Sequence, residues 1–287
     1  MLLNGRELLE VAAKENFAIA AFNISDWAMF QGIMSVSEEL NAPVIIAIHP
    51  DELTHTGDEI MPAILRRCQK SKIPTIVHLD HGTTYEHAIW AINAGFTSLM
   101  IDGSSLPFEE NIAITKRVVG AAHAAGISVE AELGTVGAND SYGESGAKEI
   151  IYTDPADAVH FVSATSIDSL AVAIGTSHGL YPAGMTPKLK IDLLQNLNSL
   201  ISKPLVLHGG SGNPDSEIAQ GVLNGINKIN ISSDIKVAYH DEMRIVLKNT
   251  KLREPLMIQP ACVEAMKKVA AHKIKLFKSN GKADLYT

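Results

Sequence analysis

Residues 74–82 read PTIVHLDHG, a short apolar run that opens with proline and ends in two polar residues and a glycine. The apolar part, 74–79, has the length of a β-strand. An apolar run of this kind, buried on both faces, is typical of a parallel sheet that helices cover on both sides. The polar residues that follow it, Asp80 and His81, would then stand at the carboxyl end of that strand.

The same pattern recurs along the whole chain. Seven further apolar runs of strand length occur at 18–22, 43–48, 97–101, 127–133, 169–174, 204–207 and 227–231. Segments with helical spacing lie between them, at 26–40, 85–94, 109–125, 155–165 and 216–224. Eight alternating units predict a (β/α)₈ TIM barrel, a single domain over residues 1–287. A basic helix at 261–277 would extend the barrel at the C-terminus and pack across it or against a partner subunit.

An open, doubly wound sheet is the alternative architecture. Such a sheet commonly carries a glycine-rich nucleotide fingerprint after its first strand. Here the residues after the first predicted strand are Asn23, Ile24 and Ser25, with no glycine among them. The barrel is therefore favoured.

Composition narrows the class of partner. The chain of 287 residues has a formal net charge of −8, which disfavours a basic groove for nucleic acid. The longest apolar run, 43–48, is far shorter than the roughly 20 residues that cross a bilayer. Cys68 and Cys262 stand alone, so neither a disulfide framework nor a cysteine zinc site is predicted. We expect a cytoplasmic protein without a membrane or nucleic-acid partner.

Three histidines follow predicted strands: His81 after the third, His178 after the sixth and His208 after the seventh. The active site of a TIM barrel lies at the carboxyl ends of its strands, so these imidazoles should meet. Three histidines suit a tetrahedral zinc with one open position. Any one of them alone could be a structural histidine, and His49 and His78 are competing ligands.

Carboxylates accompany these histidines. Asp80 could exchange a proton with a substrate hydroxyl near the metal, or it could orient a histidine. Asp102 and Glu132 could orient the ligands or hold a second cation, and the first role is favoured. The loop 134–153 is long and polar and is a candidate lid, in which Asp140, Glu144 or Glu149 could act as acid or base. The alternative is a solvated surface loop.

Two segments near the end of the barrel predict a phosphate site. Residues 208–212, HGGSG, follow the seventh strand, and residues 230–233, NISS, lead into the helix after the eighth. Glycine lets the backbone approach an anion, and the start of a helix offers unpaired N–H groups. The alternative is a tight turn and a helix that Ser232 or Ser233 caps.

Taken together, these motifs resemble the class II, zinc-dependent ketose-bisphosphate aldolases, especially the tagatose-bisphosphate aldolase branch, over essentially the whole chain. The motifs that carry the resemblance are AFN at 21–23, HLDHG at 78–82, MIDGS at 100–104, EAELG at 130–134, AIGTSHG at 173–179 and LHGGSG at 207–212.

The resemblance implies a role for each matching residue. His81, His178 and His208 would bind catalytic zinc, and Asp80 would donate or accept the proton. Arg253 would reach the far phosphate. The residues implied to bind substrate are Asn23, Gly179, Gly209, Gly210, Ser211, Asn230, Ile231, Ser232 and Ser233. A monovalent cation, Na⁺ or K⁺, often helps at the phosphate in this family, and a homodimer or homotetramer is implied.

The chain departs from the family pattern at two places. The family lid reads Gly-Gly, a variable residue, then Glu-Asp, whereas Asp140 stands here in the position of that glutamate. Fructose-specific members often carry Asp-Thr-Asp after the Asn-Ile pair, but residues 232–234 read Ser-Ser-Asp. These departures leave the lid base and the choice between tagatose and fructose 1,6-bisphosphate open.

The predicted reaction is reversible aldol cleavage of a ketose 1,6-bisphosphate to dihydroxyacetone phosphate and glyceraldehyde 3-phosphate. A Schiff-base aldolase would need a lysine at the barrel mouth, and Lys228 lies near the start of its strand instead. A zinc hydrolase of this fold typically has a His-x-His pair on strand one, where Asn23 stands. Another phosphorylated ketose, or a sugar-phosphate-binding accessory subunit of low turnover, remains the alternative.

Overall fold

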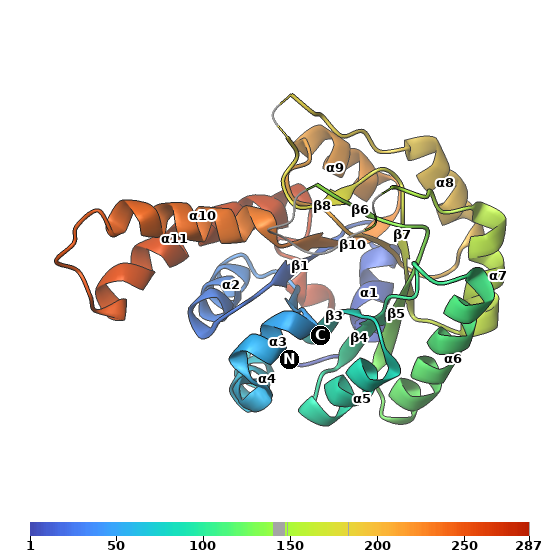
Figure 1. Ribbon diagram of the computed structural model, residues 1–287, viewed down its shortest axis with the longest axis horizontal. Helices are drawn as coiled ribbons and strands as arrows, with labels where there is room; N and C mark the ends of the chain where they lie inside the picture. Colours follow the sequence, from blue (N-terminus) through green and yellow to red (C-terminus); the bar gives the residue numbers. More distant parts are fainter. Residues whose placement is uncertain (140–146, 148, 183, 287) are drawn as a thin grey trace.

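Eight parallel strands hydrogen-bond in a closed ring in the order β1-β10-β9-β7-β5-β4-β3-β2 (Figure 1). The computed structural model describes residues 1–139, 147, 149–182 and 184–286. The barrel strands are β1 (Ile19–Asn23), β2 (Val44–Ile48), β3 (Thr75–Gly82), β4 (Ser98–Ile101), β5 (Ser128–Leu133), β7 (Ser169–Val172), β9 (Leu205–Leu207) and β10 (Ile226–Ile231). The predicted (β/α)₈ barrel, a single domain, is confirmed.

Helices cover the outside of this ring, and one of them, α1 (Gly5–Lys14), covers its amino-terminal end. The others are α2 (Trp27–Glu39), α3 (Pro50–Thr56), α4 (Met61–Lys70), α5 (Tyr85–Ala94), α6 (Phe108–Ala124), α7 (Pro155–Thr165), α8 (Ile191–Leu200), α9 (Asp215–Leu223), α10 (Ser233–Val246) and α11 (Pro255–Leu276), with 3₁₀ turns at Asp58–Ile60 and Ala283–Tyr286. Several begin where a side chain accepts a hydrogen bond from a free backbone N–H: Asp26 caps α2, Thr84 caps α5 and Asp154 caps α7.

Two apolar layers hold the barrel together. The larger layer lies between the sheet and the helices, where alternate strand residues point outward. The smaller one lies inside the barrel and contains Phe17, Ile19, Ile45 and Ile76, packed against Leu8 of α1. Because α1 contacts β3, β5, β7 and β10, it closes the amino-terminal end of the barrel. The polar groups inside the barrel therefore lie between this apolar layer and the carboxyl-terminal end of the strands.

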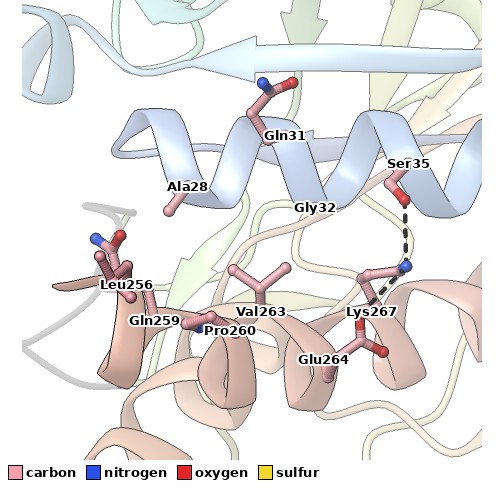
Figure 2. A pocket seen from close by; sticks show the side chains of 10 residues that line it. All are labelled: Ala28, Gln31, Gly32, Ser35, Leu256, Gln259, Pro260, Val263, Glu264 and Lys267. Carbon is pink, nitrogen blue, oxygen red and sulfur yellow. Dashed lines mark hydrogen bonds and ion pairs between the residues drawn. The ribbon is translucent and has the colours of Figure 1, made fainter.

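The C-terminal helix predicted at 261–277 is the last part of α11. This helix packs along α10 and against α2, and the α10–α11 hairpin projects away from the barrel (Figure 1). Figure 2 shows the groove between α2 and α11, where Lys267 Nζ lies 3.2 Å from Ser35 Oγ. None of the residues that line this groove belongs to the histidine cluster described below. No described helix is long and apolar enough to cross a membrane.

Candidate active site

His81 owes its position to an irregularity in β3. The pairing of β3 with β4 shifts register between Leu79 and Gly82, and His81 has a positive φ of 49°. Neighbouring residues of a regular strand point to opposite faces, but a bulge re-aims one of them. Asp80 and His81 can therefore both take part in the cluster at the mouth. The left-handed conformation costs a non-glycine residue roughly 1–2 kcal/mol, which the surrounding contacts must offset.

His178 reaches the mouth by a longer path than predicted. The strand β7 already ends at Val172, and His178 belongs to β8 (Ser177–His178), which pairs with β6 (Gly137–Ala138) in a separate small parallel sheet. The backbone carbonyl of His178 accepts a hydrogen bond from Asn139 N at 2.9 Å. This small sheet joins the loops that follow β5 and β7, and it fixes the histidine at their junction.

The three predicted histidines meet at the mouth. The ring centre of His81 lies 4.9 Å from that of His178 and 4.5 Å from that of His208, and all three side chains are buried. One nitrogen of each ring can be chosen so that the three atoms lie within 4.8 Å of one another. Such spacing suits three ligands of one ion.

The hydrogen bonds of two rings test whether they suit a metal. His81 Nδ1 lies 3.0 Å from Asp102 Oδ2, and His208 Nε2 lies 2.8 Å from Glu130 Oε1. The other ring nitrogens, His81 Nε2 and His208 Nδ1, are buried without a hydrogen-bond partner among the described residues. Metal-binding histidines are commonly held in this way, with a carboxylate on one nitrogen and the metal on the other. The donor set therefore fits a divalent metal.

The two competing histidines are engaged elsewhere. His49 Nδ1 accepts a hydrogen bond from Asp51 N and caps α3. His78 lies deeper in the barrel, with Nδ1 2.8 Å from Ser98 Oγ and Nε2 3.2 Å from Lys228 Nζ.

Asp80 lies beside the histidines and is fully buried. Its carboxylate accepts hydrogen bonds from Asn23 Nδ2 at 2.6 Å and Asn230 Nδ2 at 2.9 Å, and it lies 4.0 Å from His208 Nδ1. Burial alone would raise the pKa of Asp80, but nearby positive charge, that of His81 first and also that of Lys228, outweighs it and holds this pKa well below its usual range. The two asparagines predicted to bind substrate thus hold an ionised Asp80.

Asp102 and Glu132 both lie near His81 but differ in environment. Asp102 orients His81 and also accepts from Ser104 N and Oγ at 3.0 and 2.6 Å. Burial and the neighbouring charge of Asp102 raise the pKa of Glu132 to about 8. A nitrogen of His81 and one oxygen of each carboxylate also lie within 4.8 Å of one another, so a role in holding a second cation stays a prediction.

The two predicted phosphate loops lie against each other. Ser211 Oγ accepts from Ser232 N at 3.2 Å and Asp234 N at 3.3 Å, so it contacts the start of α10. Gly210 N donates to Asn230 O, and a Cβ on Gly210 would lie only 2.6 Å from that carbonyl oxygen. The Ser232 side chain forms no capping bond to described residues, whereas Ile231 is a core residue of the barrel wall. Gly179 follows His178 directly in the sequence; it is buried and has a positive φ of 85°.

Glu149 and Arg253, the predicted lid and phosphate residues that the structure does describe, are exposed and lie outside this cluster. Asp140 and Glu144 lie outside the described residues. The Glu149 side chain is exposed, and its backbone carbonyl accepts from Thr135 Oγ1 at 2.8 Å. Arg253 lies between α10 and α11 in the projecting hairpin, 86% exposed, with Glu254 Oε1 3.8 Å away. Their predicted roles remain predictions.

Glu130 and Lys228 are absent from the predicted site, and His78 was named only as a competing metal ligand. Glu130, Lys228 and His78 lie inside the barrel, and Glu130 bonds to His208. Their spacing held a signal: Glu130 stands two positions before Glu132, and Lys228 two before Asn230, so each pair shares one face of its strand.

The chain matches known proteins along almost its whole length. The model of the class II fructose-bisphosphate aldolase family matches residues 3–282. The fructose-bisphosphate aldolase of Thermus caldophilus is 36% identical, over 99% of this chain and 100% of its own length. That of Geobacillus stearothermophilus is 37% identical, over 98% and 99%. The crystal structure of the YdjI aldolase from Escherichia coli K12 is 37% identical, with a TM-score of 0.86 over 99% of this chain and 100% of that one. Since the family model matches residues 3–282 and these relatives are 36–37% identical over nearly the whole chain, the chain belongs to the class II fructose-bisphosphate aldolase family and is an aldolase, a carbon–carbon lyase.

Proposed function

We propose that this chain catalyses the zinc-dependent, reversible cleavage of tagatose or fructose 1,6-bisphosphate to dihydroxyacetone phosphate and glyceraldehyde 3-phosphate. The observation that carries the proposal is a pair of buried ring nitrogens, His81 Nε2 and His208 Nδ1, that have no hydrogen-bond partner among the described residues and lie beside the ionised Asp80. These groups supply two free metal ligands and a base at one mouth.

His81, His178 and His208 would hold the zinc, whose chemistry is Lewis-acid polarisation of the ketose carbonyl. Asp80 would accept the proton of the C4 hydroxyl in cleavage and return it in condensation. Asn23 and Asn230 keep its carboxylate fixed and ionised, so the base is oriented before substrate arrives. In our proposal, a lid carboxylate, Asp140, Glu144 or Glu149, moves the proton on the dihydroxyacetone carbon.

Residues 209–211, residues 230–233 and Gly179 would bind the phosphate of the dihydroxyacetone half. The Ser211 hydroxyl already accepts from two N–H groups at the start of α10, and such groups are favourable donors to an anion. A monovalent cation, Na⁺ or K⁺, would assist there, and Arg253 would bind the far phosphate. We propose a cytoplasmic homodimer or homotetramer.

The names of the relatives favour a fructose bisphosphate, whereas Ser232, where fructose-specific members often carry an aspartate, leaves the choice between the two epimers open. An aldolase for another phosphorylated ketose is the second candidate, since one phosphate pocket beside one zinc suits any such cleavage.

The test measures release of dihydroxyacetone phosphate from tagatose and fructose 1,6-bisphosphates in parallel, each with a chelator and with zinc added back. Cleavage that stops with chelator and returns with zinc is expected, and the ratio of the two rates names the preferred epimer. A zinc-containing protein that cleaves neither substrate would contradict the proposal and favour another ketose or an accessory subunit.

A further inference from the structure

A charged pair lies inside the barrel, directly beneath the histidine cluster. Lys228 of β10 and Glu130 of β5 are 1% and 2% exposed. Lys228 Nζ lies 2.8 Å from both carboxylate oxygens of Glu130 and 3.2 Å from His78 Nε2. Burying two charges is costly even when they are paired, and a well-packed apolar pair often serves stability as well. The position of this pair therefore calls for a role other than stability alone.

The hydrogen-bonding capacity of each group fixes where the protons lie. A lysine ammonium only donates, and its three hydrogens match three acceptors here: two oxygens of Glu130 and His78 Nε2. His78 must therefore carry its proton on Nδ1, which lies 2.8 Å from Ser98 Oγ. No hydrogen of Lys228 is left for a substrate carbonyl.

The hydrogen bonds of Glu130 also fix the position of the proton on His208. A carboxylate that accepts two bonds from an ammonium is an acceptor only, so the 2.8 Å contact to His208 Nε2 requires a proton on that nitrogen. A neutral imidazole with its proton on Nε2 carries its lone pair on Nδ1. His208 Nδ1 is buried without a hydrogen-bond partner among the described residues, and it lies 4.0 Å from Asp80 Oδ1 at the barrel mouth.

We propose that Lys228 is a positioning residue for the metal centre: it holds Glu130 as a pure acceptor, and Glu130 in turn fixes the tautomer of His208 that presents Nδ1 to the ion. This inference rests on the proposed metal site. It assigns to β5 and β10 a part in holding the ion at the three histidines, none of which belongs to either strand.

The test compares cobalt(II) binding by the wild-type protein and Lys228→Met. The variant replaces the ammonium with an apolar chain of similar length. The dissociation constant for Co²⁺ comes from competition with a chromophoric chelator, and the visible spectrum of the bound ion reports its ligands. Loss of a partner that orients a metal ligand typically costs 10- to 100-fold in affinity, and we expect a loss in that range with an altered spectrum.

Two double variants keep the proposal testable if Lys228→Met does not fold. Both replace Lys228 with Met; one adds Glu130→Gln, whose amide oxygen still accepts from His208, and the other adds Glu130→Leu, which cannot accept. The Gln variant should bind Co²⁺ at least tenfold more tightly than the Leu variant. Arg6→Met is the matched control, because it breaks an ion pair with Asp168 at 2.8 Å, among residues that do not contact the histidine cluster. It should leave the affinity and the spectrum unchanged.

The outcomes separate this inference from the proposed function. The positioning role alone would be overturned if the wild-type protein bound one Co²⁺ per chain and Lys228→Met bound it with the same affinity and spectrum. The same conclusion would follow if the double variant with Glu130→Leu bound Co²⁺ as tightly as the one with Glu130→Gln. A wild-type protein that binds no Co²⁺ at the histidines would overturn both.

Discussion

Asp80 and the two asparagines that hold it form the smallest unit of the candidate active site. The carboxylate has both oxygens occupied by amide donors, so it stays ionised although it is fully buried. In Asp80→Asn the new amide still accepts from one asparagine. The other can rotate its amide group, since Asn23 Oδ1 and Asn230 Oδ1 have no described partners. The variant should therefore fold and keep its metal.

We expect Asp80→Asn to lower kcat for bisphosphate cleavage by about 10²- to 10⁴-fold, the usual contribution of a general acid or base. The measurement is turnover together with zinc content per chain. Asp51→Asn, which changes a carboxylate that is 93% exposed, is the matched control and should keep full turnover. An Asp80→Asn protein with one zinc and wild-type kcat would remove Asp80 from the mechanism.

At the scale of single residues, the sequence predicted chemistry better than geometry. The types and order of His81, His178 and His208 sufficed to predict that these residues meet. The bulge at His81 was not predicted, because positive φ at a histidine follows from the register of β4 against β3 and from no local signal. Lys228 was predicted to lie near the start of its strand, away from the barrel mouth. The sequence did not predict that the long side chain brings Nζ to Glu130.

At the scale of elements, the turn after β9 and the start of α10 act as one unit through Ser211. Its hydroxyl accepts from Ser232 N and Asp234 N, and a phosphate at this helix start would use the same kind of donor.

We expect Ser211→Ala to raise KM for the bisphosphate about tenfold with a smaller change in kcat, because one hydrogen-bonding partner of the turn is lost. Steady-state kinetics measure both constants. Ser199→Ala removes an exposed hydroxyl bonded to Asn196 O and should change neither; an unchanged KM for Ser211→Ala would argue against a phosphate at this turn.

A partly exposed ion pair, Arg67 with Glu38, links α4 to α2. Glu38 accepts from Arg67 Nη1 and Nη2 at 2.8 and 2.7 Å and from Ser71 Oγ at 2.6 Å. The bonds from Arg67 lower the pKa of Glu38 below its ordinary value of 4.5. Since the folded pKa is the lower one, the pair stabilises the fold fully above pH 4.5 and loses this effect as pH falls through the folded value.

Arg67→Met should therefore destabilise the protein by about 1 kcal/mol at pH 7 and by clearly less near pH 3. Urea unfolding at the two pH values measures the difference. Arg244→Met is the control, because Arg244 and its partner Asp241 are 72% and 63% exposed, and their loss should be nearly neutral at both. A penalty for Arg67→Met that does not change with pH would show that packing, rather than charge, joins the two helices.

At the scale of the whole molecule, the alternation of strand and helix predicted the barrel, and most strand bounds differ from the prediction by one or two residues. Two features escaped that pattern. Helix α1 precedes the first strand and closes the barrel floor, which becomes evident only when the strands form a ring. His178 lies in the two-residue strand β8 rather than directly after β7. Such a strand is too short to show the alternation of apolar and polar residues that marks a strand in the sequence.

The three proposed ligands come from β3, β8 and the end of β9, so a bound metal would join segments that lie far apart in the chain. An ion that binds only the folded state at about 1,000 times its dissociation constant stabilises that state by about 4 kcal/mol. For a chain somewhat longer than 250 residues, each kcal/mol shifts Tm by roughly 2–4 °C.

We expect chelation to lower Tm by about 10 °C and zinc to restore it, as followed by scanning calorimetry. His178→Ala should melt at the lower temperature with or without chelator. His272→Ala, which removes a half-exposed surface histidine, should respond like the wild type. If Tm stayed constant while the chelator removed the zinc, the barrel mouth would have to be fully formed by the protein alone, and the metal would be bound at no gain to the fold.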